Sequence, residues 1–212
     1  MVTKHDFIIV SLLMLLAAVP LVAGGVRIFS MITGAEILDE GARFAASPVP
    51  MMTHIVGATL FALLGALQFS AGLRTKHPQW HRMAGRVAAL AGVAVALSGL
   101  WMTLFYPLDT HELLHWVRLA VSLAMALFIG LSTYAILNKH VVAHRNWMIR
   151  AYALGMGAGT QVLLFIPLYM IARETSAFVD ALAMSFAWLI NFVVAEWVIT
   201  KQSSPRRRVQ MA

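Results

Sequence analysis

The eight histidines are the residues whose type and spacing could do chemistry in this chain, which has no cysteine. Four of them stand in two copies of one pattern, Lys-His-x-x-x-His-Arg, at 76–82 and 139–145. Without cysteine, the chain has no disulfide, thiolate nucleophile, iron–sulfur ligand or covalent haem attachment. Imidazole ligates haem iron and divalent metals, so histidine is what remains for redox or metal chemistry.

The histidine spacing suggests two copies of one helical hairpin. His54 precedes His81 by 27 residues and His115 precedes His144 by 29, and each interval holds one apolar stretch and one loop. Pro78 disfavours helical geometry at the residue before it and suits the first position of a helix. The second histidine of each pattern is therefore the one expected inside a helix.

The elements that must carry these histidines are membrane-spanning helices. Hydrophobic residues make up 60% of the 212 positions and charged residues 12%, with a mean hydropathy of +0.79. A helix of about 20 apolar residues crosses a bilayer, and an open strand edge cannot. Six stretches reach that length: about 7–30, 53–73, 84–106, 113–136, 147–172 and 180–200. The first could also be read as a signal peptide, but its length favours a retained helix.

Basic residues fall mainly on one side of these six spans. That side holds twelve: Lys4, Arg74, Lys76, Arg82, Arg86, Lys139, Arg145, Arg150, Lys201, Arg206, Arg207 and Arg208. The other side holds four: Arg27, Arg43, Arg118 and Arg173. This bias predicts a bacterial inner-membrane protein with both termini cytoplasmic. The formal charge of +7 is then a topology signal, and no basic–aromatic pattern indicates nucleic-acid binding.

We therefore expect an all-α integral membrane domain over residues 1–201. Its core, about 53–172, would be a four-helix bundle made of two duplicated hairpins. Residues 202–212 would form a basic cytoplasmic tail near anionic lipid headgroups.

In such a bundle two parallel helices present one histidine each at each membrane face. His54 and His115 would lie at the outer face, and His81 and His144 at the inner face. A bis-histidine haem takes one imidazole from each of two helices, so these four are the predicted ligands of one or two b-type haems. Arginines at the inner face could pair with haem propionates, although topology and lipid phosphates explain them equally well: Arg82, Arg86, Arg145 and Arg150.

Small residues continue from each histidine at helical spacing. From His81 they are Gly85, Ala89, Gly92, Ala96, Gly99 and Thr103. Such stripes would admit a bulky planar ligand, but they also let transmembrane helices pack closely with no ligand at all.

The stretch from His54 to Pro167 resembles a family of predicted bacterial membrane proteins, domain-of-unknown-function family 2306. The resemblance rests on His54-Ile-Val-Gly57, Gly65-Ala-Leu-Gln68-Phe69, Arg74, His81-Arg82-x-x-Gly85-Arg86 and His144-Arg145-Asn146-Trp147-Met148-Ile149-Arg150. It implies a fold and hardly any function, and His115 is not part of it.

The layout of the four histidines is also similar to cytochrome b561, in which four central helices hold two haems. This similarity implies a haem-dependent transmembrane oxidoreductase. Besides the lipid bilayer, such a protein would have a small-molecule electron donor or a quinone as its partner.

Two metal sites compete with haem. Residues 111–115 read HELLH, the zinc-protease pattern, but a catalytic zinc needs a third protein ligand, and only His54 is another histidine on that side. Glu112 has a simpler role, because Asp109-Thr-His-Glu112 has the form of a helix cap. A di-iron site built from both repeats would need about eight histidines, and the inner face offers five at most.

The alternative of another class is a cofactor-free membrane protein, such as a small transporter or scaffold. Polar residues fall inside the spans, where lipid makes them costly: Gln68, Gln161, Asn191 and Glu196. Thr160 and Gln161, followed by Pro167, could line a small-molecule path, and Arg150 or Arg86 could neutralise Glu196. The sequence shows none of the interrupted half-helices typical of many transporters.

Overall fold

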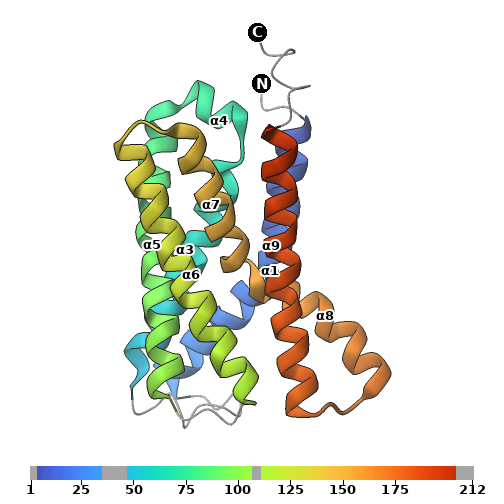
Figure 1. Cartoon of the computed structure of the whole chain (residues 1–212). Helices are drawn as coiled ribbons and strands as arrows, with labels where there is room; N and C mark the ends of the chain where they lie inside the picture. Colours follow the sequence, from blue (N-terminus) through green and yellow to red (C-terminus); the bar gives the residue numbers. More distant parts are fainter. Residues whose placement is uncertain (1–3, 35–46, 107–110, 204–212) are drawn as a thin grey trace.

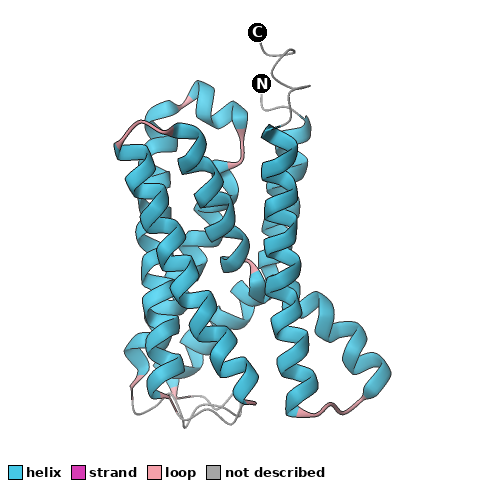
Figure 2. Cartoon of the chain, viewed as in Figure 1, coloured by secondary structure: helices cyan, strands magenta, loops and turns pink. Residues whose placement is uncertain are grey.

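The computed structural model describes residues 4–34, 47–106 and 111–203, and all its regular elements there are helices (Figures 1 and 2). The helices are α1 Lys4–Thr33, α3 Pro48–Gln68, α4 Ala71–Lys76, α5 Pro78–Phe105, α6 Glu112–Leu137, α7 Val141–Gly155, α8 Gly157–Ala172 and α9 Ala177–Ser203. Six spans in this part of the chain are long and apolar enough to cross a membrane, which confirms the predicted number.

The second span begins earlier and ends sooner than its hydropathy suggests. Pro48 lies in the first turn of α3, where a proline loses no hydrogen bond, so the helix starts five residues before the predicted 53. The chain leaves the helix at Phe69, and the Ser70 hydroxyl accepts from the Leu73 N–H at 3.2 Å to start α4. The segment predicted to complete this span therefore forms a separate short helix.

The fifth span is interrupted, contrary to the expectation that no helix would be. α7 ends at Gly155, α8 begins at Gly157, and Met156 stands between them. α7 stays with α3 and α6, whereas α8 diverges from them and packs against α1 and α9 (Figure 1). Hydropathy did not reveal this break, because Val141–Ala172 reads as one continuous stretch that is apolar enough to cross a membrane.

Helices α3, α5, α6 and α7 surround a core whose largest side chains are Phe61, Met125, Ile129 and Tyr152. Glycines on the predicted small-residue stripes admit these side chains. A Cβ added at Gly92 would lie 2.7 Å from both Ile129 and Phe61. The glycines at mid-membrane thus serve close packing. That the two hairpins arose by duplication stays a prediction.

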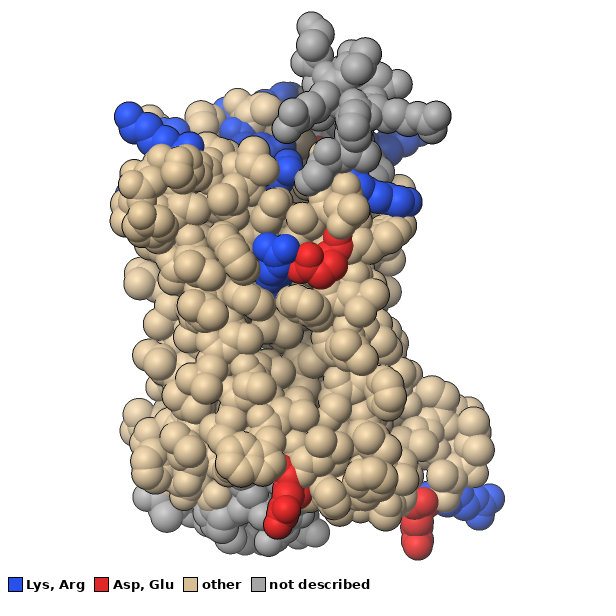
Figure 3. Space-filling view, viewed as in Figure 1, with Lys and Arg blue, Asp and Glu red and all other residues tan. Residues whose placement is uncertain are grey.

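Charges divide between the two ends of the molecule. Lys and Arg gather at the end with α4, the start of α1 and the end of α9, here called the α4 end, and the middle of the view is almost uncharged (Figure 3). Buried Asp6 of α1 accepts from the Gly72 N–H of α4 at 3.1 Å and ties the two helices together. The predicted tail, residues 202–212, starts within α9, which runs to Ser203. From residue 204 onward it lies outside the described residues.

Candidate functional site

His144 lies in the first turn of α7, at the α4 end, and its ring is fixed by α6. Its Nδ1 is 3.1 Å from the carbonyl oxygen of Ser132 and 2.7 Å from that residue's hydroxyl, which itself donates to the His144 carbonyl. A carbonyl only accepts, so Nδ1 carries the proton and Nε2 carries the lone pair. This is the arrangement that orients a histidine for ligation through Nε2.

His81 lies in the first turn of α5, as predicted, after His77 as N-cap and Pro78 as first helical residue. It is close enough to His144 to be affected by that imidazole's charge, and it also senses Arg74 and Arg82. Its Nδ1 is buried without a hydrogen-bond partner in the described part of the chain. Haem iron takes the Nε2 of a histidine, so this Nδ1 leaves His81 without the outer partner that Ser132 gives His144.

All four core helices contribute a polar or small group near this pair. Gln68 of α3 faces Gly85, one turn beyond His81 on α5, where an added Cβ would lie 3.1 Å from the Gln68 Oε1. The other two helices contribute Ser132, from α6, and His144, from α7. The sequence singled out both histidines but missed Ser132, because a serine in an apolar helix carries no signal of its partner.

His54 is the outer histidine of α3, and its ring faces α5 and α6. Its Nδ1 lies 3.2 Å from the Val95 carbonyl oxygen and 3.1 Å from the Ser98 hydroxyl. A Cβ added at Gly99 of α5 would lie 3.4 Å from the Cε1 of His54 and 3.2 Å from the hydroxyl oxygen of Ser122, on α6. Because α3 begins at Pro48, His54 lies six residues inside the helix instead of at its start.

The structure does not bring His54 and His115 to one level. His115 is seven residues from Ser122 along α6, about 10 Å at 1.5 Å per residue. Its ring packs edge-on against Trp116, with centroids 5.5 Å apart. His54 and His115 therefore lie at different depths along the bundle, and their pairing around one haem stays a prediction.

The HELLH motif, residues 111–115, forms the N-cap and first turn of α6. The His111 Nδ1 accepts from the Leu113 N–H at 3.2 Å, and Glu112 occupies the first turn, where a carboxylate suits the positive helix end. Asp109, part of the predicted cap, lies outside the described residues. Within the described ranges, no three His, Asp or Glu side chains form a group that could hold a metal ion.

The four predicted arginines differ in their surroundings. Arg82, Arg86 and Arg145 are exposed at the α4 end. Arg150 instead donates to Glu196 of α9 from Nε and Nη2, at 2.5 and 2.9 Å, and its guanidinium lies 4.6 Å from the Trp147 ring centroid. This confirms the expected neutralisation of Glu196, and it commits Arg150 to the α7–α9 contact.

The junction between α7 and α8, within the fifth membrane span, is a second cluster of polar side chains. Asn191 of α9 donates from Nδ2 to the Ala153 carbonyl at 3.0 Å and accepts from the Thr160 hydroxyl at 2.7 Å. One side chain thus bridges both half-helices and satisfies a carbonyl that the break frees. The signal that could have found the junction is Gly155 and Gly157 flanking one residue within an apolar run.

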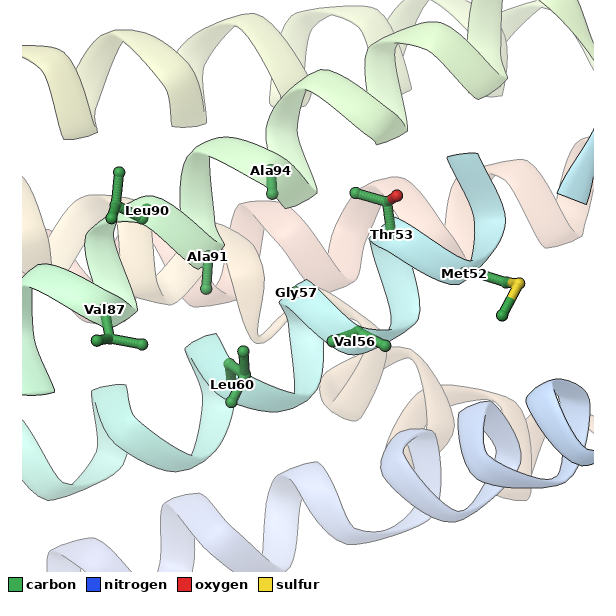
Figure 4. A pocket seen from close by; sticks show the side chains of 9 residues that line it. All are labelled: Met52, Thr53, Val56, Gly57, Leu60, Val87, Leu90, Ala91 and Ala94. Carbon is green, nitrogen blue, oxygen red and sulfur yellow. The ribbon is translucent and has the colours of Figure 1, made fainter. Parts of the chain in front are cut away.

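A groove between α3 and α5 carries none of this chemistry (Figure 4). It is open to the membrane side and almost entirely apolar, with lining residues Met52, Thr53, Val56, Gly57, Leu60, Val87, Leu90, Ala91 and Ala94. No histidine lines it. The candidate site is therefore the His81–His144 pair at the α4 end.

A family model described as Predicted membrane protein (DUF2306) matches residues 51–199, which include all four predicted histidine ligands. Comparisons with curated proteins and with solved structures gave no match.

Proposed function

The chain belongs to the DUF2306 family of predicted membrane proteins, and we propose that it is a b-type haem-binding electron carrier with one haem site between His81 and His144. The observation that carries the proposal is that His81 and His144 both lie in the first turn of a core helix at the α4 end, with the Nδ1 of His144 held by Ser132. A bound haem would supply reversible one-electron chemistry there.

The charges around the pair favour haem over a bare metal ion. Arg74 and Arg82 act on His81, and two guanidinium groups would repel a divalent cation. The carboxylates of a haem would instead pair with them. The residues themselves would act as follows: Ser132 holds the proton on the Nδ1 of His144, the arginines balance carboxylate charge, and the packed helices exclude water.

The same basic residues support the proposed orientation. The α4 end gathers the lysines and arginines and would face the cytoplasm, which places both termini there and the site on the cytoplasmic half of an inner membrane (Figure 3).

The experiment that tests the proposal is purification in detergent from cells supplied with a haem precursor. We expect a red protein with a Soret band, whose bands sharpen on reduction, and about one haem per chain. A colourless protein that folds and stays monodisperse would contradict haem binding. It would favour the second candidate, a cofactor-free transporter, which the interrupted fifth span supports.

A further inference from the structure

The α7–α8 junction brings two N–H donors to one place inside the membrane. A Cβ added at Gly157 of α8 would lie 2.1 Å from the Nε1 of Trp188, on α9. Gln161 is four residues further along α8, and residues four apart share one face of a helix. Both donors therefore belong to the α8–α9 interface beside the break.

These donors lack partners, unlike their neighbours. The Nε2 of Gln161 is buried with no hydrogen-bond partner, and Trp188 makes no hydrogen bond with the described residues. Thr160 and Asn191, in contrast, are bonded to each other. Unpaired donors are costly in lipid, so an acceptor from outside the chain would account for them.

Charge and access define the class of acceptor. Both donors are neutral, so they suit an uncharged oxygen with two lone pairs, such as a carbonyl, better than a carboxylate. Next to the two donors, Leu163 of α8 is 59% exposed and Leu189 of α9 is 54% exposed. A lipid-soluble molecule can therefore approach this interface sideways.

We propose that Gln161 and Trp188 bind a ring carbonyl of a quinone at the α7–α8 junction. The choice of a quinone among lipid-soluble carbonyl compounds rests on the proposed function, since an electron carrier needs a redox partner. Stacked aromatic rings join α7, α6 and α9: Trp147 stacks on Phe128 with centroids 5.4 Å apart, and Phe128 on Phe192 with centroids 6.3 Å apart. Trp147 follows His144 by three residues, and Phe192 follows Asn191 directly.

Equilibrium dialysis of a short-chain ubiquinone against the purified full chain tests the proposal. Trp188→Phe removes the N–H and keeps an aromatic ring, and Gln161→Met removes the amide at similar length. We expect each to weaken quinone binding about tenfold, the loss of one hydrogen bond, while Trp101→Phe, the matched control at the far end of α5, binds like the wild type. Palmitate, the charged alternative, should not compete.

Any of the following results would overturn the proposal: no quinone binding by the wild type, unchanged binding in both variants, equal weakening in Trp101→Phe, or displacement of quinone by palmitate. A fall in thermal stability of both variants with unchanged quinone binding would also overturn it, because the two side chains would then serve only the junction. Haem content, measured on the same preparations, separates the two proposals. Quinone binding by a haem-free protein would refute the proposed function and leave the quinone site standing.

Discussion

His81→Ala and His144→Ala should each purify with at least tenfold less haem than the wild-type protein. Each variant removes one of two axial imidazoles, and even the loss of an outer partner of a ligating histidine costs 10–100-fold in affinity. Ser132→Ala tests that outer partner: it leaves His144 in place and removes the hydroxyl 2.7 Å from its Nδ1, so that only the backbone carbonyl of residue 132, at 3.1 Å, still holds the ring. We expect weaker haem retention, intermediate between the wild type and His144→Ala. Haem per protein, measured as the pyridine complex, is the readout.

The first histidine of each repeat supplies the matched controls. His77 and His140 are the N-caps of α5 and α7 and make no side-chain capping bond, so His77→Ala and His140→Ala should keep their haem. His115→Ala should be silent as well, because His115 lies about two turns of α6 from the level of His54. Equal haem content in all five histidine variants would refute the ligand assignment, and so would a loss confined to His115→Ala.

Gly159→Ala should be the most damaging single-methyl change in the half-helix α8. An added Cβ there would lie 2.3 Å from the backbone carbonyl oxygen of Leu16, on α1, and backbone cannot rotate aside as a side chain can. We expect the free energy of unfolding to fall by roughly 1–3 kcal/mol, the usual cost of overpacking. Unfolding in mixed micelles, followed by circular dichroism, measures it.

Gly130→Ala is the matched control, because no atom lies within 4 Å of a Cβ added at Gly130. Alanine also favours a helix more than glycine does, so this variant should be at least as stable as the wild type. If Gly159→Ala were as stable as Gly130→Ala, α1 and α8 could not be packed as closely as the structure has them.

The features that the sequence predicted best depend on local chemistry. Pro78 indicated the start of α5 because the first turn of a helix is where a proline loses no hydrogen bond, and Glu112 marked the start of α6. The pairing of Arg150 with Glu196 followed from the cost of an unpaired charge in lipid. Each inference needed only one or two residues and the knowledge that lipid surrounds the helices.

Features that depend on contacts between helices escaped the sequence. Hydropathy finds the length of a span, but in lipid every face of a helix is apolar, so it does not show which face packs inward. The break at Met156 and the depth of His54 were missed for this reason. The stripe of small residues was also ambiguous until Phe61 and Ile129 were seen to pack against Gly92.

The histidine site was half predictable. Spacing and topology placed His81 and His144 at one face, and the structure has both in the first turns of α5 and α7 at the α4 end. The same reasoning paired His54 with His115, but the early start of α3 sets His54 deeper in the membrane, against Val95 and Ser98. Helix starts are set by loops and prolines, so equal spacing along the chain does not guarantee equal depth.

Electron paramagnetic resonance of the oxidised, purified wild-type protein tests whether His81 and His144 together ligate one haem iron. Two axial imidazoles make ferric haem low-spin, so we expect a single low-spin species, one per chain, that disappears in His81→Ala and His144→Ala alike. A high-spin signal from haem with one axial histidine, or a low-spin signal that survives the loss of either residue, would contradict it.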